Sequence, residues 1–253
     1  MLAIVIIGDE ILNGQVDDEN LPFMIQQFSR AGYPPREVRV IRDDTDVIAT
    51  SVSELLARYT YVVTAGGVGP THDDVTHSGI ARAFGVPLER NAAMMAFLSA
   101  RHKNDVSANV ARMAMLPQGS EVLGHEDGRW PIIRKENCFM LPGLPQALRD
   151  KIPRLISLLP RVAPAWVAAV YLDAEEVLFA HWLDELQQRF STVTIGSYPV
   201  LHEREFKTRV SITSESRDTV CSVISLIEAY ARPHGWFVRA DNPRQGWRTT
   251  DGR

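Results

Sequence analysis

The sequence predicts an α/β protein, in which a three-layer α/β/α domain with a mostly parallel sheet precedes a small ferredoxin-like α+β domain. Short apolar runs alternate with helical segments in the first part of the chain, which indicates a parallel sheet covered by helices. Prolines at positions 153, 160 and 164 then mark a linker. Beyond it the predicted order is β-α-β-β-α-β, as in a ferredoxin-like unit. The predicted boundaries are residues 1–160 for the first domain, 166–240 for the second and 241–253 for a polar tail.

Each predicted element follows from a local pattern. Short apolar runs predict buried strands, and helical segments end at a glycine or begin at a capping aspartate. In the first domain we expect strands over residues 3–7, 37–41, 61–64, 112–116 and 138–141, and helices over 21–30, 46–58, 78–85 and 91–103. In the second domain we expect strands over 166–172, 192–195, 206–213 and 235–238, and helices over 174–190 and 217–231.

Composition excludes some classes of function. Of the 253 residues, 45% are hydrophobic and 23% are charged, as in ordinary globular proteins. The net charge of −4 does not suggest a basic face, so we expect no nucleic-acid partner. No apolar stretch approaches the length of a membrane span, and the two cysteines have no metal-type spacing. We therefore expect a cytoplasmic protein with free thiols and no membrane partner.

The run TAGGVGPTHDDVT, from Thr64 to Thr76, is the strongest functional signal. It lies between a predicted strand and a predicted helix, where glycines let the backbone approach a ligand and free amides attract phosphate. Asp73 and Asp74 add the carboxylate oxygens that a divalent cation prefers, although an aspartate near a helix start is also typical of a cap. The run matches neither a Walker loop nor the G-x-G-x-x-G spacing. It therefore predicts a site for a small-molecule nucleotide or pterin phosphate.

Further candidates lie at the same predicted edge of the sheet, because ligands of parallel sheets bind outside the carboxyl ends of the strands. Asp9 and Glu10 follow the first strand, and Asp43 and Asp44 follow the second; in both places a capped turn is the alternative. Together these carboxylates suit a magnesium-type ion that is bound mainly through water and phosphate. Such an ion activates water for attack on a phosphoryl group. His72, inside the glycine loop, is a candidate for polarising phosphate or moving a proton.

Four motifs in the same order make the chain similar to one family. They extend over nearly the whole chain, as Ile6–Gly14, Thr64–Thr76, Leu141–Pro145 and Ile195–Pro199. They resemble the molybdopterin-binding (MoaB/Mog-like) domain, as found in competence/damage-inducible protein A and at the N-terminus of eukaryotic-type FAD synthases. The order Thr-His-Asp-Asp in the glycine loop resembles the FAD synthase branch most closely. The resemblance implies the same two-domain fold that the sequence pattern predicts.

The resemblance also implies an activity. Domains of the competence-protein and FAD-synthase type are associated with metal-dependent cleavage of the pyrophosphate in ADP-ribose or FAD, and we expect this activity here. The alternatives are a non-catalytic pterin-phosphate-binding module and a molybdopterin adenylyltransferase. In the adenylyltransferases, aspartates of the glycine loop and after the second strand are needed for activity; by motif these are Asp74 and Asp43, with Asp44 as an alternative. Related proteins form oligomers, so we also expect a homo-oligomer, with a dimer as the first expectation.

The predicted site residues form three groups. The predicted catalytic residues are Asp74, Asp43, Asp73 and His72. The predicted ligands of the divalent ion, Mg²⁺ or similar, are Asp74, Asp43 and Glu10. The predicted phosphate-binding and ligand-binding residues are Gly8, Asp9, Glu10, Thr64, Gly66, Gly67, Gly69, Pro70, Thr71, Thr76, Pro142, Gly143, Ser197 and Tyr198.

Overall fold

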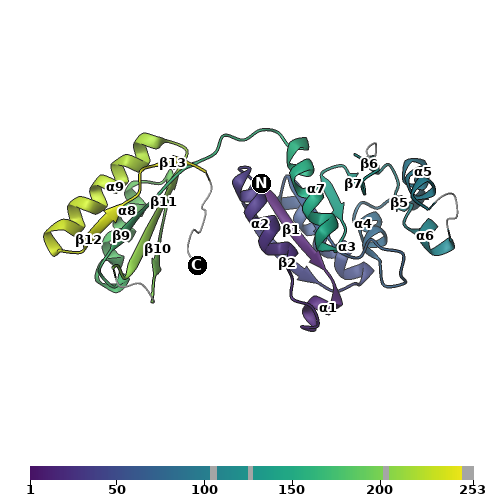
Figure 1. The fold of residues 1–253 in the computed structure, drawn as a ribbon, viewed down its shortest axis with the longest axis horizontal. Coiled ribbons are helices and arrows are strands. Elements are labelled where there is room, and N and C mark those ends of the chain that lie inside the picture. Colours follow the sequence, from purple (N-terminus) through teal and green to yellow (C-terminus); the bar gives the residue numbers. More distant parts are fainter. Residues whose placement is uncertain (103–106, 125–127, 202–204, 247–253) are drawn as a thin grey trace. The chain divides into compact units, whose positions relative to one another are not determined.

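The computed structural model describes residues 1–102, 107–124, 128–201 and 205–246. The chain divides into two compact units, which Figure 1 shows in colours that follow the sequence. The first unit contains Met1–Ser29 and Tyr33–Pro160, and the second contains Arg30–Gly32 and Arg161–Arg253. Within the described residues, no helix has both the length and the apolar composition that are needed to cross a membrane.

The first unit is built on a sheet with the strand order β2-β1-β3-β8-β7-β6. The strands β2, β1, β3 and β8 are parallel, whereas β7 is antiparallel to β8 and β6 is antiparallel to β7. A separate antiparallel pair is formed by β4 and β5. The strands are β1 (Leu2–Ile7), β2 (Pro35–Ile41), β3 (Tyr61–Ala65), β4 (Leu88–Arg90), β5 (Met115–Pro117), β6 (Glu121–Leu123), β7 (Ile132–Lys135) and β8 (Cys138–Leu141).

Helices supply a core on both faces of this sheet. Every residue of β1 is buried, and one face of the strand packs through Val5 in a cluster with Ile48 and Ile80. Alternate residues of a strand point to opposite faces, and the buried residues Phe28 and Leu148 lie outside that cluster. The predicted mostly parallel α/β fold is therefore confirmed. The helices are α1 (Asp9–Leu12), α2 (Asn20–Arg30), α3 (Thr45–Arg58), α4 (Thr76–Ala83), α5 (Ala92–Arg101), α6 (Ala108–Arg112) and α7 (Pro145–Leu158).

The second unit is a small α+β fold, as predicted. Its antiparallel sheet has the order β10-β11-β9-β12, and β13 also pairs with β9. The helices α8 and α9 pack on this sheet through a core of their own, which includes Leu183, Val210 and Val223. The elements are β9 (Trp166–Leu172), a 3₁₀ turn (Glu176–Leu178), α8 (Ala180–Arg189), β10 (Val193–Pro199), β11 (Thr208–Ser214), α9 (Arg217–Ala231), a second 3₁₀ turn (Arg232–His234), β12 (Phe237–Ala240) and β13 (Arg244–Gln245).

The structure corrects several of the predicted elements. Residues 112–116 are not one strand, because the Ser107 hydroxyl accepts a hydrogen bond from the amide of Val110 and starts the helix α6, which ends at Arg112. The helix predicted over 174–190 begins only at Ala180, after a 3₁₀ turn. Part of the predicted polar tail forms β13, and residues 247–253 of that tail lie outside the described part of the chain.

The strand predicted over 192–195 continues as β10 to Pro199. It pairs with β11 along its whole length, which brings Gly196 and Pro199 into the sheet. A proline is tolerated there because β10 is an edge strand, where an amide donor is not needed on the outer side.

The turn after β3 sets the course of the glycine loop. Gly66 has a φ of +110°, and a Cβ atom on it would lie 2.0 Å from the carbonyl oxygen of Ile7 at the end of β1. Its amide donates to the carbonyl of Leu141, at the end of β8, over 3.1 Å. Only a residue without a side chain fits between these strand ends.

We expect Gly66→Ala to lower the free energy of unfolding by about 3 kcal/mol, because the new methyl group collides with the Ile7 carbonyl at an unfavourable φ. The control is Gly85→Ala, where φ is +65° but no atom lies within 4 Å of the new Cβ. This variant should lose only about 1 kcal/mol. Urea unfolding of both proteins measures the difference, and equal losses would show that contact with Ile7 is not the constraint.

Candidate functional site

Asp74 closes the glycine loop on itself. Its carboxylate accepts hydrogen bonds from the amide of Gly69 at 2.7 Å, from the amide of Thr71 at 2.8 Å and from the Thr71 hydroxyl. Thr76 is buried at the start of α4 and donates from its hydroxyl to the carbonyl of Gly66 over 2.9 Å. The side chains of the loop therefore hold it in one conformation.

The amides of the glycine loop differ in their availability. Those of Gly66 and Gly69 already donate hydrogen bonds within the protein. Among the described residues, the amides of Gly67 and Val68 have no hydrogen-bond partner, and both residues line a cavity. Since unpaired amides attract phosphate, Gly67 of the predicted phosphate-binding glycines and its neighbour Val68, which was not predicted, are the candidate phosphate donors in this structure.

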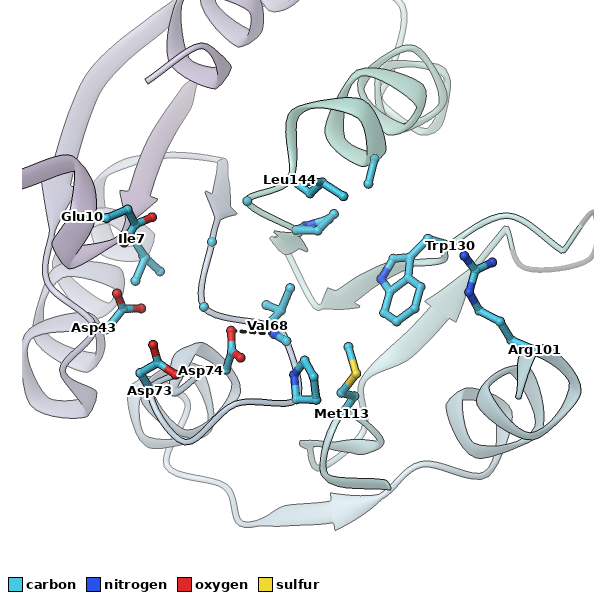
Figure 2. A pocket seen from close by; sticks show the side chains of 17 residues that line it. Ile7, Glu10, Asp43, Val68, Asp73, Asp74, Arg101, Met113, Trp130 and Leu144 are labelled. Carbon is cyan, nitrogen blue, oxygen red and sulfur yellow. Dashed lines mark hydrogen bonds between the residues drawn. The ribbon is translucent and has the colours of Figure 1, made fainter. Parts of the chain in front are cut away.

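Asp43 lies in a cluster of carboxylates at the ends of β1 and β2. Burial raises the pKa of Asp43, and the carboxylates of Glu10, Asp9 and Asp73 raise it further. A hydrogen bond that Asp43 accepts from the Asp9 amide at 3.0 Å acts in the opposite direction. Figure 2 shows Asp43, Glu10 and Asp73 on the same side of the cavity. In the part of the chain that the structure describes, no basic side chain is paired with Asp43 or Glu10, so negative charge accumulates here.

Asp44 has a different role from its neighbour Asp43. It is the N-cap of α3, and its carboxylate accepts hydrogen bonds from the amides of Val47 at 3.0 Å and Asp46 at 2.8 Å. These two bonds lower the pKa of Asp44. The motif comparison named Asp43, with Asp44 as the alternative, for the aspartate after the second strand. The structure places Asp43 at the cavity and Asp44 at the helix cap.

The cavity has a volume of about 640 Å³, within the usual range for small-molecule sites. It lies at the carboxyl ends of the parallel strands, where the topology predicts a ligand site. The predicted site residues that line it are Glu10, Asp43, Gly66, Gly67, Gly69, Pro70, Asp73, Asp74, Pro142 and Gly143. The lining residues that the sequence analysis did not predict are Ile7, Val68, Arg101, Met113, Trp130, Leu144 and Ala147.

Other predicted residues support the site without lining it. Thr64 is buried in β3 with its hydroxyl 3.5 Å from the carbonyl of Phe139, and Thr71 and Thr76 fix the glycine loop. Gly8 connects β1 to α1, which begins at Asp9, and the Gly8 amide donates to the carbonyl of Ile41. These residues have structural contacts of their own, which explain their presence in the motifs.

His72 is not brought to the cavity. Its side chain is 96% exposed, and its Nδ1 atom lies 3.9 Å from the nearer Asp73 oxygen. The glycine loop turns this side chain into solvent, so a catalytic role for His72 finds no support in the structure. Ser197 and Tyr198 belong to β10 of the second unit, where the Ser197 hydroxyl donates to the Glu176 carboxylate over 2.8 Å.

Ile7, Val68 and Leu144 lie inside the motifs, and the other lining residues that were missed come from segments without a motif. Arg101 ends α5, Met113 follows α6, and Trp130 precedes β7. Only the fold brings these separate segments together, so their spacing in the sequence carries no signal. Leu144 is different, because it lies inside the motif Leu141–Pro145 and follows a predicted strand end.

The donor set agrees in chemistry with a divalent ion. In the described residues, no group of three or more His, Cys, Asp or Glu side chains forms a ready-made metal site. Both oxygens of Asp74 accept hydrogen bonds from the loop, and one oxygen of Asp43 accepts a hydrogen bond from the Asp9 amide, so Asp43 and Glu10 are the less engaged of the three predicted ligands. Magnesium commonly keeps several waters and binds through one or two carboxylates together with substrate phosphates. Asp43 and Glu10 fit a site of that kind, and the metal itself stays a prediction.

His77 is a buried titratable group in the first turn of α4. It is 8% exposed, and within the described structure its Nε2 atom has no hydrogen-bond partner. Burial lowers the pKa of His77 to about 4, against smaller opposing effects of Asp74 and of a hydrogen bond with the Met115 backbone. His77 is therefore neutral in the folded protein at neutral pH.

The fold and the cavity define a class of proteins that bind small nucleotide-type or pterin-type ligands at the end of a parallel sheet. Residues 3–161 match the family model described as "Probable molybdopterin binding domain", and residues 164–237 match "FAD synthase, middle domain". The chain therefore belongs to the molybdopterin-binding domain family, as its motifs predicted.

Named relatives agree with this assignment. The chain is 30% identical over 269 aligned residues to "Probable FAD synthase" of Caenorhabditis elegans. The aligned region covers 93% of this chain and 52% of that protein. It is 34% identical over 149 residues to a "CinA-like protein" of Anaeromyxobacter sp. (strain K), over 56% of this chain and 36% of that protein. Among solved structures it is similar to CinA from Thermoplasma acidophilum, with a TM-score of 0.57 and 25% identity over 62% of this chain and 95% of that one. The chain thus spans about half the length of the FAD synthase relative.

We expect Asp74→Asn to loosen the glycine loop, because an amide nitrogen cannot accept the hydrogen bonds that one of the two carboxylate oxygens accepts now. The expected loss is about 2 kcal/mol of unfolding free energy, with faster hydrogen exchange at the amides of Gly69 and Thr71. Asp73→Asn is the matched control, because the Asp73 side chain is exposed. It should leave hydrogen exchange at these amides unchanged and should not lower the unfolding free energy, because it removes repulsion with Asp43. Equal exchange rates in both variants would contradict this role of Asp74.

His77 should make stability depend on pH. Its pKa is lower in the folded protein, about 4, than its ordinary value of 6.5, so the unfolded chain binds more protons between these values. Full stability is present above about pH 6.5, and about 3 kcal/mol should be lost as the pH falls to about 4. His77→Gln should lose less stability over this interval. Urea unfolding at several pH values compares the two proteins, and parallel curves would contradict the prediction.

Proposed function

We propose that the chain hydrolyses the pyrophosphate bond of a dinucleotide such as FAD or ADP-ribose, with the help of a divalent ion. The observation that carries this proposal is the juxtaposition of two kinds of group in one cavity. The unpaired amides of Gly67 and Val68 suit phosphate oxygens, and the carboxylates of Asp43 and Glu10 have no cation partner among the described residues. A diphosphate together with a divalent ion satisfies both sets of groups.

The residues of the cavity have different proposed roles in the reaction. Asp43 and Glu10 would hold the ion, which supplies neutralisation of the diphosphate and a lowered pKa of bound water. The amides of Gly67 and Val68 would bind and orient the phosphate oxygens. Asp73 is the candidate general base, because its carboxylate lines the cavity. The neighbouring Thr71 side chain and its own backbone amide lower the pKa of Asp73, which keeps it ionised but makes it a weaker base than an ordinary aspartate.

The relatives support a nucleotide as the substrate. The C. elegans relative is named an FAD synthase, and residues 164–237 match the middle domain of that class of enzyme. The shared region includes both units of this chain, which makes a flavin nucleotide a reasonable first ligand to test. ADP-ribose offers the same diphosphate with a different group on one side.

The family description favours one alternative, a pterin-phosphate-binding module without catalysis. The model that matches residues 3–161 is named for molybdopterin. Molybdopterin also carries phosphate, so the glycine loop suits either ligand. Tight binding of molybdopterin in a calorimetric titration, without hydrolysis of FAD or ADP-ribose under any condition, would favour this alternative over the hydrolase.

Incubation with FAD or ADP-ribose and a panel of divalent ions should release AMP. We expect Asp43→Asn to lower this activity by about two orders of magnitude or more, because a neutral amide does not replace a charged ligand of a hard cation. The melting temperature should hold or rise, since the substitution removes repulsion with Glu10, Asp9 and Asp73. Absence of AMP release with every ion, at high protein concentration, would refute the proposal.

Asp44→Asn is the matched control at the adjacent position. Asparagine caps a helix about as well as aspartate does, and the Asp44 carboxylate is engaged by the amides of α3. This variant should keep both the activity and the melting temperature. An equal loss of activity in the two variants would mean that general electrostatics, and not a place at the cavity, explains the effect of Asp43.

A further inference from the structure

The cavity has two chemically different sides. Figure 2 shows Asp43, Glu10 and Asp73 on one side, and Trp130 and Arg101 on the other. Apart from Arg101, the lining near Trp130 is apolar, with Met113 below and Leu144 above in that view. The proposed diphosphate site occupies the polar side and leaves the apolar side without a function.

Two side chains contact the Trp130 ring, and a hydrogen bond fixes the backbone that carries it. Phe97 packs edge-on against it, with ring centroids 5.4 Å apart and an interplanar angle of 89°. The guanidinium carbon of Arg101 lies 5.9 Å from the ring centroid, within the range of a cation–π contact. The Trp130 carbonyl accepts a hydrogen bond at 2.6 Å from the buried Lys151 ammonium group. A ring that is fixed in this way loses little conformational entropy when a ligand packs on it.

Apolar side chains on this side of the cavity are not fully covered by the rest of the protein. Leu144 is 65% exposed although it lines the cavity, and Trp130 is only partly buried. Large exposed apolar groups that face one cavity are typical of a ligand site. The volume of about 640 Å³ leaves room for more than a diphosphate.

We propose that Trp130 is a specificity-determining residue that stacks on the planar heterocyclic ring of a nucleotide whose diphosphate lies at the glycine loop. This inference rests on the proposed function for the position of the diphosphate. Aromatic side chains stack on nucleobases and similar rings through dispersion and the removal of apolar surface from water. The ligand class is therefore a nucleotide with a flavin or purine ring, and inorganic pyrophosphate lacks the group that Trp130 recognises.

The test compares binding of FAD, ADP-ribose and inorganic pyrophosphate, each with Mg²⁺, by calorimetry. The native protein should bind at least one of the two dinucleotides more tightly than pyrophosphate. Trp130→Leu should weaken that dinucleotide by about five- to hundredfold and leave the Kd of pyrophosphate unchanged. Trp130→Phe, which keeps an aromatic face, should recover much of the loss. Thermal unfolding of both variants checks that the fold is retained.

Two results would overturn the inference. One is a native protein that binds neither dinucleotide more tightly than pyrophosphate. The other is a Trp130→Leu variant that either keeps the dinucleotide affinity or weakens pyrophosphate by the same factor, because an equal loss indicates only structural support. Hydrolysis is measured separately: ring-dependent binding without AMP release would refute the proposed activity and leave the role of Trp130 standing.

Discussion

The site depends on close backbone packing around Gly66. Its Cα lies against the Ile7 carbonyl, its amide binds the Leu141 carbonyl, and a Cβ on Gly143 would lie only 3.3 Å from its Cα. The buried Asn20 side chain donates to the Gly143 carbonyl over 2.6 Å and ties α2 to the same point. Because no side chain separates the ends of β1, β3 and β8, the loops that follow them converge on one small volume.

This convergence brings carboxylates together at an electrostatic cost. Two pairs of adjacent aspartates show how the chain limits that cost. Asp44 and Asp74 each accept backbone hydrogen bonds that compensate their charge, as a helix cap and as the closure of the glycine loop. Asp43 and Asp73 face the cavity, and Asp43 carries the raised pKa of a partly buried group among like charges. Like charges that are only partly compensated at a cavity destabilise the folded protein, and such groups are frequent at functional sites.

Local patterns in the sequence were sufficient for much of the fold and for half of the cavity. The buried strand Leu2–Ile7 and the glycine loop each consist of consecutive residues, so composition and local pattern are enough to predict them. Trp130 and Arg101 could not be predicted, because only tertiary packing brings them to the loop. The separate roles of Asp43 and Asp44 depend on which amides each side chain reaches. The exposure of His72 could not be foreseen either, because spacing does not encode the direction of a loop side chain. The expected dimer stays a prediction.

The charges of the cavity also affect whether the proposed divalent ion and diphosphate bind independently or together. Glu10, Asp43, Asp73 and Asp74 line it, and Arg101 is the basic residue among the described lining residues. A diphosphate that entered such a cavity alone would meet repulsion that two backbone amides cannot offset. A divalent cation alone would meet Asp43 and Glu10 as the less engaged carboxylates of the predicted ligand set, with no ready-made cage among the described residues. If both bind here as proposed, the cation would offset the repulsion that the diphosphate meets, and the diphosphate would supply ligands that the cation lacks, so by linkage their affinities would increase together. The arrangement therefore suits recognition of a metal–diphosphate pair better than recognition of either component.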